Sequence, residues 1–300
     1  MLKDFTYIIG FKRRYNYIFL IEALYRLSKL PLSLHISISA LMGYVLVNGK
    51  IDSKGLFVFF SILLLACGGA VLNNLQDKEY DKLFTRTKDR LIPNGVVSEK
   101  SALFIASFFI ISGLLILFYL SKSYYILSLG ATSIILYNFI YTALKKISSL
   151  GVIPGALCGM LPPLIGWLSA GGNFYDIKII YIMLVFGIWQ FPHYFMVLLQ
   201  NRKDFESHKT VINYYPEKMF KAVVAIWVLN YFSIISTLPL VGILNSKSGN
   251  IFLLFCFFII LPFVIYNLIK QNYKFSFIGL NCSLLIFMFF VMIESVHKGV

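Results

Sequence analysis

The sequence predicts an all-α integral membrane protein with about nine transmembrane helices. Of its 300 residues, 59% are hydrophobic and only 13% are charged, whereas an ordinary soluble domain carries about 25% charged residues. Nine stretches are long and apolar enough to cross a hydrocarbon core about 30 Å thick as helices of about 20 residues. The basic residues, moreover, gather on one of the two sides that these helices define. Too little charge remains to cover a soluble protein of this size.

The predicted spans follow one another through short polar connections. They lie near residues 31–49, 56–76, 102–120, 124–143, 151–170, 177–199, 220–243, 250–269 and 275–295. The division of 102–143 into two helices depends on the polar break at 121–123. Residues 1–28 place aromatic side chains between basic ones, which predicts an interfacial, partly amphipathic lead-in. No linker or low-complexity tract divides the chain, so we expect residues 1–300 to form a single membrane domain.

Basic residues are distributed unevenly between the two sides. Twenty-one of the 27 Lys and Arg residues fall on the side of the N-terminal arm and six on the other. Because cytoplasmic segments carry an excess of Lys and Arg, we expect the N-terminus and the two long loops, 77–101 and 200–219, to be cytoplasmic. The net charge of +14 is then explained by topology and by anionic lipid rather than by nucleic acid. Because the N-terminus has no signal-peptide or transit pattern, we expect a multi-pass protein of a bacterial cell (inner) membrane.

An oxygen-rich stripe is predicted at the end of the second span. Asn73, Asp77 and Asp81 are four residues apart, so a helix that continues through them would place all three on one face. Two carboxylates and an amide suit Mg²⁺, which prefers a few carboxylates together with substrate phosphate oxygens. A solvated helix end would show the same residues. A carboxylate at mid-membrane nevertheless costs about 2.5–3.5 kcal/mol, so a stripe entering the bilayer favours a functional role.

Basic residues and a further carboxylate follow in the two long loops. Arg86, Lys88 and Arg90 come directly after the stripe, and cations there would neutralise phosphate charge that a metal leaves uncompensated. In the second loop, Lys203 and Asp204 offer a further cation and a further metal ligand. Each group taken alone is as typical of a solvated face, and it is their position beside the stripe that favours a phosphate site.

The sixth span carries a histidine, His193, directly after Pro192. A histidine at membrane depth either hydrogen-bonds a neighbouring carbonyl, binds haem iron or orients a polar acceptor. In the fifth span, the pair Pro162-Pro163 predicts a break in the helix, which membrane proteins tolerate where the backbone faces a cavity.

The spacing of Asn73, Asp77 and Asp81 resembles the first aspartate-rich motif of the UbiA-type intramembrane prenyltransferases. The resemblance narrows to the haem branch of that superfamily, the protoheme IX farnesyltransferases or haem O synthases. The blocks that carry it are Leu72–Gly95, Lys29-Leu30-Pro31, Lys145-Lys146, Gly159–Trp167 and Trp189–His193. Together they cover about residues 29–205 in the family's order.

The resemblance implies nine helices around a lateral, lipid-accessible central cavity. It implies Mg²⁺-dependent transfer of a farnesyl group from farnesyl diphosphate to a vinyl group of protohaem IX (haem b). Carried over to this chain, the metal-binding and catalytic residues would be Asn73, Asp77, Asp81 and Asp204. The residues that contact substrate would be Lys29, Arg86, Lys88, Arg90, Lys145 and Lys203 for the diphosphate, and His193 for the haem.

Alternative functions stay open from the sequence. Residues 205–213 lack the proline-containing stretch that usually follows the family's second acidic site, and this departure bears on the acceptor. An aromatic quinone precursor as the acceptor, or a terpene cyclase without one, would keep the same fold and metal chemistry. A transporter would also use polar residues and broken helices in the membrane. Against a transporter, the acidic residues gather at one face rather than at the midplane.

Overall fold

The computed structural model describes residues 17–206 and 216–298. Within these ranges every regular element is helical, and nine segments are long and apolar enough to cross a membrane. Each of the nine predicted spans corresponds to one of them, with ends that differ by a few residues. The chain is therefore an integral membrane protein, as the sequence predicts. The part of the predicted lead-in at 1–16, and the proline-poor stretch at 207–213, lie outside the described residues.

The first five spanning segments are α3 (Leu30–Asn48), α4 (Ser53–Gln76), α6 (Glu99–Ser121), α7 (Tyr124–Ile134) continued by η1 (Ile135–Tyr141) and α8 (Thr142–Leu144), and η2 (Ser149–Gly151) with α9 (Val152–Ser169). The other four are α10 (Ile177–Gln200), α12 (Glu217–Ser236) with η4 (Leu238–Val241), α13 (Lys247–Phe255) continued by η5 (Cys256–Ile260) and α14 (Leu261–Ile269), and α15 (Tyr273–Lys298). The described residues also include the short helices α2 (Tyr17–Leu27), α5 (Lys78–Asp81) and α11 (Arg202–Glu206).

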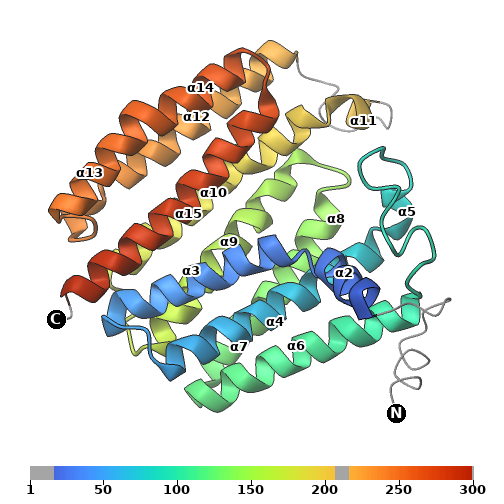
Figure 1. Ribbon diagram of the computed structural model, residues 1–300, viewed down its shortest axis with the longest axis horizontal. Helices are drawn as coiled ribbons and strands as arrows, with labels where there is room; N and C mark the ends of the chain where they lie inside the picture. The colour runs from blue at the N-terminus through green and yellow to red at the C-terminus, as the bar shows by residue number, and fades with distance from the viewer. Residues whose placement is uncertain (1–16, 207–215, 299–300) are drawn as a thin grey trace.

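Most helices pack against their neighbours in sequence, and contacts between helices further apart in the chain hold the bundle together. α4 packs against α6 and α3, and α10 packs between α9 and α12 (Figure 1). α3 also packs along α9, and α15 contacts α3, α10 and α14. The last helix therefore links the first spanning helix to the second half of the chain.

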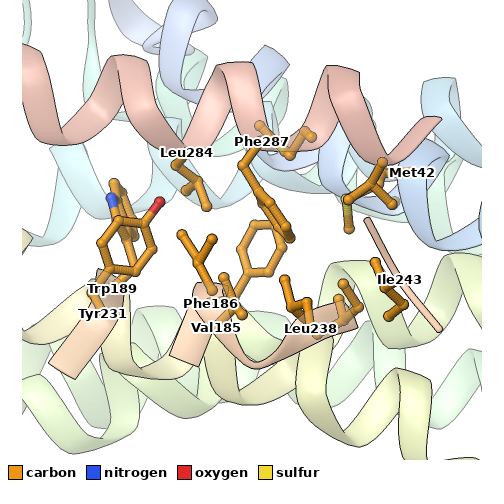
Figure 2. Close-up of a cluster of buried hydrophobic side chains, with 14 of the residues drawn as sticks. Met42, Val185, Phe186, Trp189, Tyr231, Leu238, Ile243, Leu284 and Phe287 are labelled. Atoms are coloured by element: carbon orange, nitrogen blue, oxygen red, sulfur yellow. The ribbon is translucent and has the colours of Figure 1, made fainter. Parts of the chain in front are cut away.

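Large side chains from α10, α12 and α15 fill the space between these helices (Figure 2). Tyr231 and Phe287 are completely buried, and Phe186, Trp189 and Leu284 are nearly so. Lipid tails are as apolar as these side chains, so their contact is stabilised by close van der Waals packing rather than by exclusion of water. Close packing of side chains therefore determines which helices associate.

Glycine allows α3 and α9 to approach more closely than larger residues would permit. A Cβ atom added at Gly166 would lie 1.8 Å from the carbonyl oxygen of Ala40, and one at Gly43 would lie 2.0 Å from that of Pro163. A glycine on each helix therefore lies directly against the backbone of the other helix. Small residues at such crossings are a common device of membrane helix packing.

The predicted break at Pro162-Pro163 is wrong, because both prolines lie inside the uninterrupted helix α9. Proline deprives the preceding turn of hydrogen bonds, but neighbouring helices in a membrane often compensate. Here the backbone at Pro163 packs directly on α3 beside Gly43, which holds the turn in place.

Replacing Gly166 by Ala tests the close approach of α3 and α9. We expect Gly166→Ala to lower the free energy of unfolding in detergent by about 1–3 kcal/mol or more, because the new methyl group overlaps a backbone carbonyl that cannot move without separating the helices. The matched control is Gly159→Ala on the same helix, where the nearest atom to the added Cβ is 3.9 Å away. Equal thermal stability of the two variants would contradict this account of the packing.

Candidate active site at the ends of α4 and α8

The predicted stripe lies where α4 meets the short helix α5. α4 ends at Gln76, and Asp77 leaves helical geometry with φ −94° and ψ 1° before α5 begins at Lys78. The helix is thus interrupted at Asp77, whereas the sequence analysis considered a continuous one. Backbone bonds still join the N–H of Asp77 to the carbonyl of Asn73 (3.0 Å) and the N–H of Asp81 to the carbonyl of Asp77 (2.7 Å). The three residues therefore remain about one helical turn apart, as their four-residue spacing predicts.

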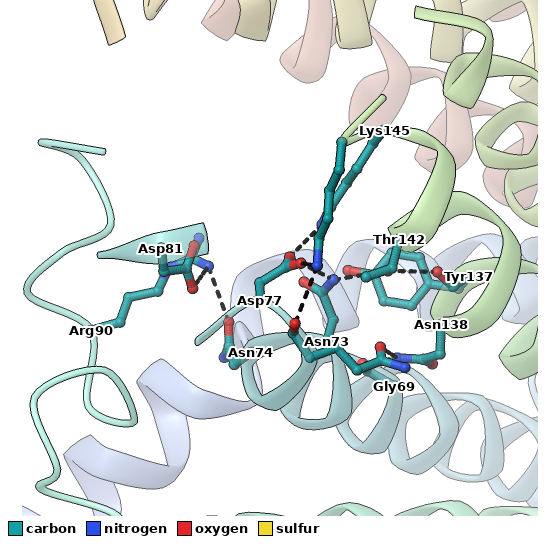
Figure 3. Close-up of polar contacts among 12 residues, drawn as sticks. Gly69, Asn73, Asn74, Asp77, Asp81, Arg90, Tyr137, Asn138, Thr142 and Lys145 are labelled. Atoms are coloured by element: carbon teal, nitrogen blue, oxygen red, sulfur yellow. Dashed lines mark hydrogen bonds and ion pairs between the residues drawn. The ribbon is translucent and has the colours of Figure 1, made fainter. Parts of the chain in front are cut away.

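Asp77 is paired with two lysines that follow α8. Its side chain is 4% exposed, Oδ2 accepts a hydrogen bond from Lys145 Nζ, and Oδ1 lies 2.9 Å from Lys146 Nζ (Figure 3). Burial alone would raise the pKa of this carboxyl, but the two ammonium groups outweigh burial and hold the pKa below its usual value. Asp77 is therefore charged, and it joins the ends of two spanning segments.

Asn73 connects this ion pair to its surroundings. Its Nδ2 donates to Asp77 Oδ2 (3.0 Å) and to the hydroxyl of Thr142 (2.9 Å), and its Oδ1 accepts from Lys29 Nζ (2.8 Å). Both ends of the amide are therefore used, which fixes its orientation. The resemblance placed Asn73, Asp77, Lys29 and Lys145 in one site, and the structure brings these four together.

Asp81 forms a second buried pair on the neighbouring side of α5. Arg90 donates from Nη1 to Asp81 Oδ2 (2.7 Å) and to Asn74 Oδ1 (3.3 Å). The hydroxyl of Thr87 donates to the backbone carbonyl of Asp81 (2.9 Å). The loop that follows α5 thus folds back onto the stripe, and this fold brings Arg90 into the site.

Positive charge exceeds negative charge in this network. Lys29, Lys145, Lys146 and Arg90 contact the polar groups described above, while the contacted carboxylates are Asp77 and Asp81. Burial, reinforced by the nearby cations Arg90 and Lys145, lowers the pKa of Lys29 to about 7. Mutual repulsion among the cations shows that the carboxylates do not neutralise them all. Such an arrangement favours binding of an anion with more than one charge.

Asp204 and Arg86 approach the network from its rim. Asp204 Oδ1 accepts a hydrogen bond from the Thr85 hydroxyl (2.7 Å). Arg86 interacts electrostatically with both Asp81 and Asp204, so it is near both acidic positions. Lys88 and Lys203 are exposed, and no ion pair joins either to these carboxylates in the described part of the chain.

The donor atoms fit a hard divalent cation such as Mg²⁺. The described residues contain no group of three or more His, Cys, Asp or Glu side chains clustered as metal ligands. Mg²⁺, however, usually takes only one or two carboxylates and completes its shell with water and phosphate oxygens. Asp77 Oδ1 is buried and faces Lys146 Nζ at 2.9 Å without a well-oriented hydrogen bond, so a metal ion that binds this oxygen would take the place of the lysine. Asn73, Asp77 and Asp81 thus offer suitable oxygen atoms.

His193 lies apart from the ion-pair network, on α10. Its ring packs 4.4 Å from that of Trp189 and 4.9 Å from that of Phe277, measured between centroids. No ion pair or hydrogen bond in the described residues connects it to Asp77 or Asp81.

Sequence reasoning passed over several residues of the network. Asn138 and Thr142 in the fourth span and Lys146 just after it are four residues apart, the same spacing as Asn73, Asp77 and Asp81. Asn138 donates to the carbonyl of Gly69 (2.9 Å) and to Gln76 Oε1 (3.2 Å), and η1 is a π-helical turn that carries it. This second polar stripe could have identified these residues as partners of the first stripe. Tyr80 was also missed: its hydroxyl is buried without a partner beside Lys146, whose Nζ lies 5.7 Å from the ring centre.

An all-helical membrane bundle with buried carboxylates and a surplus of cations at one end defines the class of protein. The chain matches the UbiA prenyltransferase family over residues 36–292 and belongs to that family. A protoheme IX farnesyltransferase of Cytophaga hutchinsonii is 35% identical over 182 residues, which are 59% of this chain and 62% of that relative. The chain thus covers less than two thirds of the relative's length.

Solved structures of low sequence identity share the fold. A UbiA homologue from Aeropyrum pernix, solved without ligand, superposes with a TM-score of 0.74 at 14% identity and covers 88% of this chain and 98% of its own. A UbiA homologue from Archaeoglobus fulgidus, bound to DMAPP and Mg²⁺, superposes with a TM-score of 0.66 at 12% identity and covers 91% of this chain and 99% of its own. These likenesses show that the helices are arranged as in the family.

A double-mutant cycle tests the pairing of Asp77 with Lys146. We expect Asp77→Asn and Lys146→Gln to be coupled in the free energy of unfolding by about 0.5–3 kcal/mol, because the two groups are in direct contact and the carboxylate is buried. The control cycle is Glu79→Gln with Lys82→Gln, whose exposed pair at 2.9 Å should couple by less than about 1 kcal/mol. Additive effects at Asp77 and Lys146 would contradict the network.

Proposed function

We propose that this protein transfers a farnesyl group from farnesyl diphosphate to a vinyl group of protohaem IX in a Mg²⁺-dependent reaction. The observation that carries the proposal is the buried network in which Lys145, Lys146 and Arg90 surround Asp77 and Asp81. A site with surplus cations and available carboxylate oxygens suits a diphosphate bound with a metal. The family and the name of the related farnesyltransferase support the choice of reaction.

Different residues of the network would hold the metal ion and the phosphate oxygens of the diphosphate. Asn73, Asp77 and Asp81, with Asp204 from the second loop, would hold Mg²⁺. The metal would supply positive charge to the leaving diphosphate. Lysines that pair with Asp77 in the absence of substrate would contact phosphate oxygens when substrate is bound. Arg86, which interacts electrostatically with both acidic positions, would contact the diphosphate from the rim, as would the exposed Lys88 and Lys203.

The chemical step breaks the bond between C1 of the farnesyl group and the diphosphate oxygen, and the diphosphate leaves with the electron pair. Cations already oriented around the site stabilise this developing negative charge. The terminal carbon of the haem vinyl group then forms a bond to C1, using its π electrons. Water adds to the cation left on the vinyl group and loses a proton, which gives a hydroxyethylfarnesyl chain. The stacked rings of Tyr137 and Tyr141, whose centroids are 5.7 Å apart, would stabilise the allylic cation through their π-faces.

Fewer residues identify the acceptor than identify the diphosphate donor. His193 is a histidine at membrane depth, which favours haem over a quinone precursor and over cyclisation without an acceptor. A transporter would have no need of paired carboxylates beside cations at one membrane face. We further propose that this face is cytoplasmic, on the distribution of basic residues in the sequence.

Alanine at the two buried carboxylates tests the reaction. We expect Asp77→Ala and Asp81→Ala each to lower the rate of Mg²⁺-dependent farnesyl transfer by at least about 100-fold, because each removes charge that positions the metal and the cations. The measurement is product formation by purified protein with farnesyl diphosphate and haem. Glu79→Ala is the matched control, since Glu79 lies on the same short helix but is exposed and pairs with exposed Lys82. Activity of either Asp variant within a few-fold of the control would refute the assignment.

A further inference from the structure

Tyr80 lies in the site, and the steps of the proposed reaction do not use it. It is on the short helix α5, between the two buried carboxylates of Asp77 and Asp81. Its hydroxyl is buried and has no hydrogen-bond partner among the described residues. An unpaired buried hydroxyl is destabilising, so the hydroxyl does not explain why a tyrosine stands here. The aromatic ring is the part of this side chain that contacts the ion-pair network.

The ring of Tyr80 is held by its neighbour Phe84. The two ring centroids are 4.7 Å apart, with planes tilted by 59°, and Phe84 is itself buried. Aromatic pairs at this separation attract one another beyond the effect of the area that they bury. The position of the Tyr80 ring is therefore fixed by packing rather than by a hydrogen bond.

The ammonium group of Lys146 lies over this ring. Its Nζ is 5.7 Å from the centre of the Tyr80 ring, within the ~6 Å over which an aromatic face attracts a cation. The same nitrogen lies 2.9 Å from Asp77 Oδ1 and donates a hydrogen bond to the backbone carbonyl of Gln76 (3.1 Å). Residues 76–80 thus supply three contacts to one ammonium group.

The other lysine that pairs with Asp77 has the same kind of environment. Lys145 donates to Asp77 Oδ2, and its Nζ is 5.3 Å from the centre of the Tyr141 ring. Each of the two lysines therefore contacts both a carboxylate oxygen and a tyrosine ring. The two rings come from different elements, α5 and η1, so the local chain geometry of one helix does not explain the repetition.

The three contacts of Lys146 would respond differently to bound substrate. A metal ion at Asp77 Oδ1 would take the place of the ammonium group, because both need the same oxygen. The Gln76 carbonyl and the Tyr80 ring are uncharged and are not among the proposed metal ligands, so these two contacts would remain. Lysine has a flexible four-carbon stem. Without the ring, a single backbone hydrogen bond would have to hold the ammonium group against the pull of water.

We propose that Tyr80 is a positioning residue that keeps Lys146 beside the diphosphate once a metal ion has taken the lysine's place at Asp77. The inference rests on the proposed function, because it takes a metal-bound diphosphate as the ligand. The aromatic face acts through the positive charge of Lys146, and the hydroxyl is not needed. Lys146 then compensates phosphate charge instead of leaving the site.

Substitutions that change the electrons of the ring without changing its packing test this role. The readout is the Kd of a non-reactive farnesyl diphosphate analogue in the presence of Mg²⁺, measured by calorimetric titration of the purified full-length protein. Tyr80→Phe keeps the aromatic face and should bind the analogue as the wild type does. Tyr80→Leu removes the face and should raise the Kd at least about threefold. Phenylalanines with increasing numbers of ring fluorine atoms at position 80 should raise the Kd stepwise, because fluorine weakens the attraction of the face for a cation.

Two controls show whether Tyr80 acts through Lys146. In a Lys146→Gln protein the cation is gone, so the fluorinated side chains should cause no further loss of affinity. Fluorination of Phe108, an exposed residue of α6, should leave the Kd unchanged. If Tyr80→Leu does not fold, the fluorinated series still decides the matter, because its rings keep nearly the size and packing of phenylalanine.

The contradictory outcomes are distinct. A Kd that is the same across the fluorinated series, or a loss in Tyr80→Phe as large as in Tyr80→Leu, would overturn the role of the ring and leave the proposed function intact. Equal fluorine effects with and without Lys146 would overturn it too, because Tyr80 would then act through another group. Wild-type protein that binds the analogue no better with Mg²⁺ than without it would overturn the proposed function and this inference together.

Discussion

The pairing of Asp77 with Lys145 and Lys146 is the interaction on which the rest of the site depends. It joins the end of α4 to the segment after α8, and the Asn73 amide extends it to Lys29 at the start of α3 and to Thr142. Three spanning segments are thereby held at one membrane face around a charged group that is nearly buried. A buried carboxylate is tolerated only with such partners, and these same partners are cations that a diphosphate needs.

Much of the fold is encoded in simple features of the sequence. The nine spans follow from length and hydropathy, because a bilayer leaves few alternatives to a helix of about 20 apolar residues. The helix break predicted at Pro162 and Pro163 was wrong, because the backbone contact at Gly43 that supports these prolines depends on tertiary packing. The interruption of the helix at Asp77 was not predicted either, because it depends on a tertiary contact: the chain turns there and places Asp81 against Arg90.

The site could be predicted in part. The four-residue spacing of Asn73, Asp77 and Asp81 identified the acidic stripe, because that spacing has a direct meaning on a helix. Its partners at and just after the end of the fourth span were harder to recognise, since Thr142 and Lys146 acquire their role only when that end is placed beside α4. Contacts between distant segments are what the structure adds.

The central claim is that the cations around Asp77 form a metal-dependent diphosphate site, and binding of a non-reactive farnesyl diphosphate analogue tests it most directly. Calorimetric titration of the purified protein should show binding that requires Mg²⁺, is abolished by a chelator and weakens steeply as salt concentration rises. Farnesol, which has the same apolar chain without the diphosphate, should bind far more weakly. Equal affinity for the two compounds, or binding of the analogue that is unaffected by removal of Mg²⁺, would contradict the account.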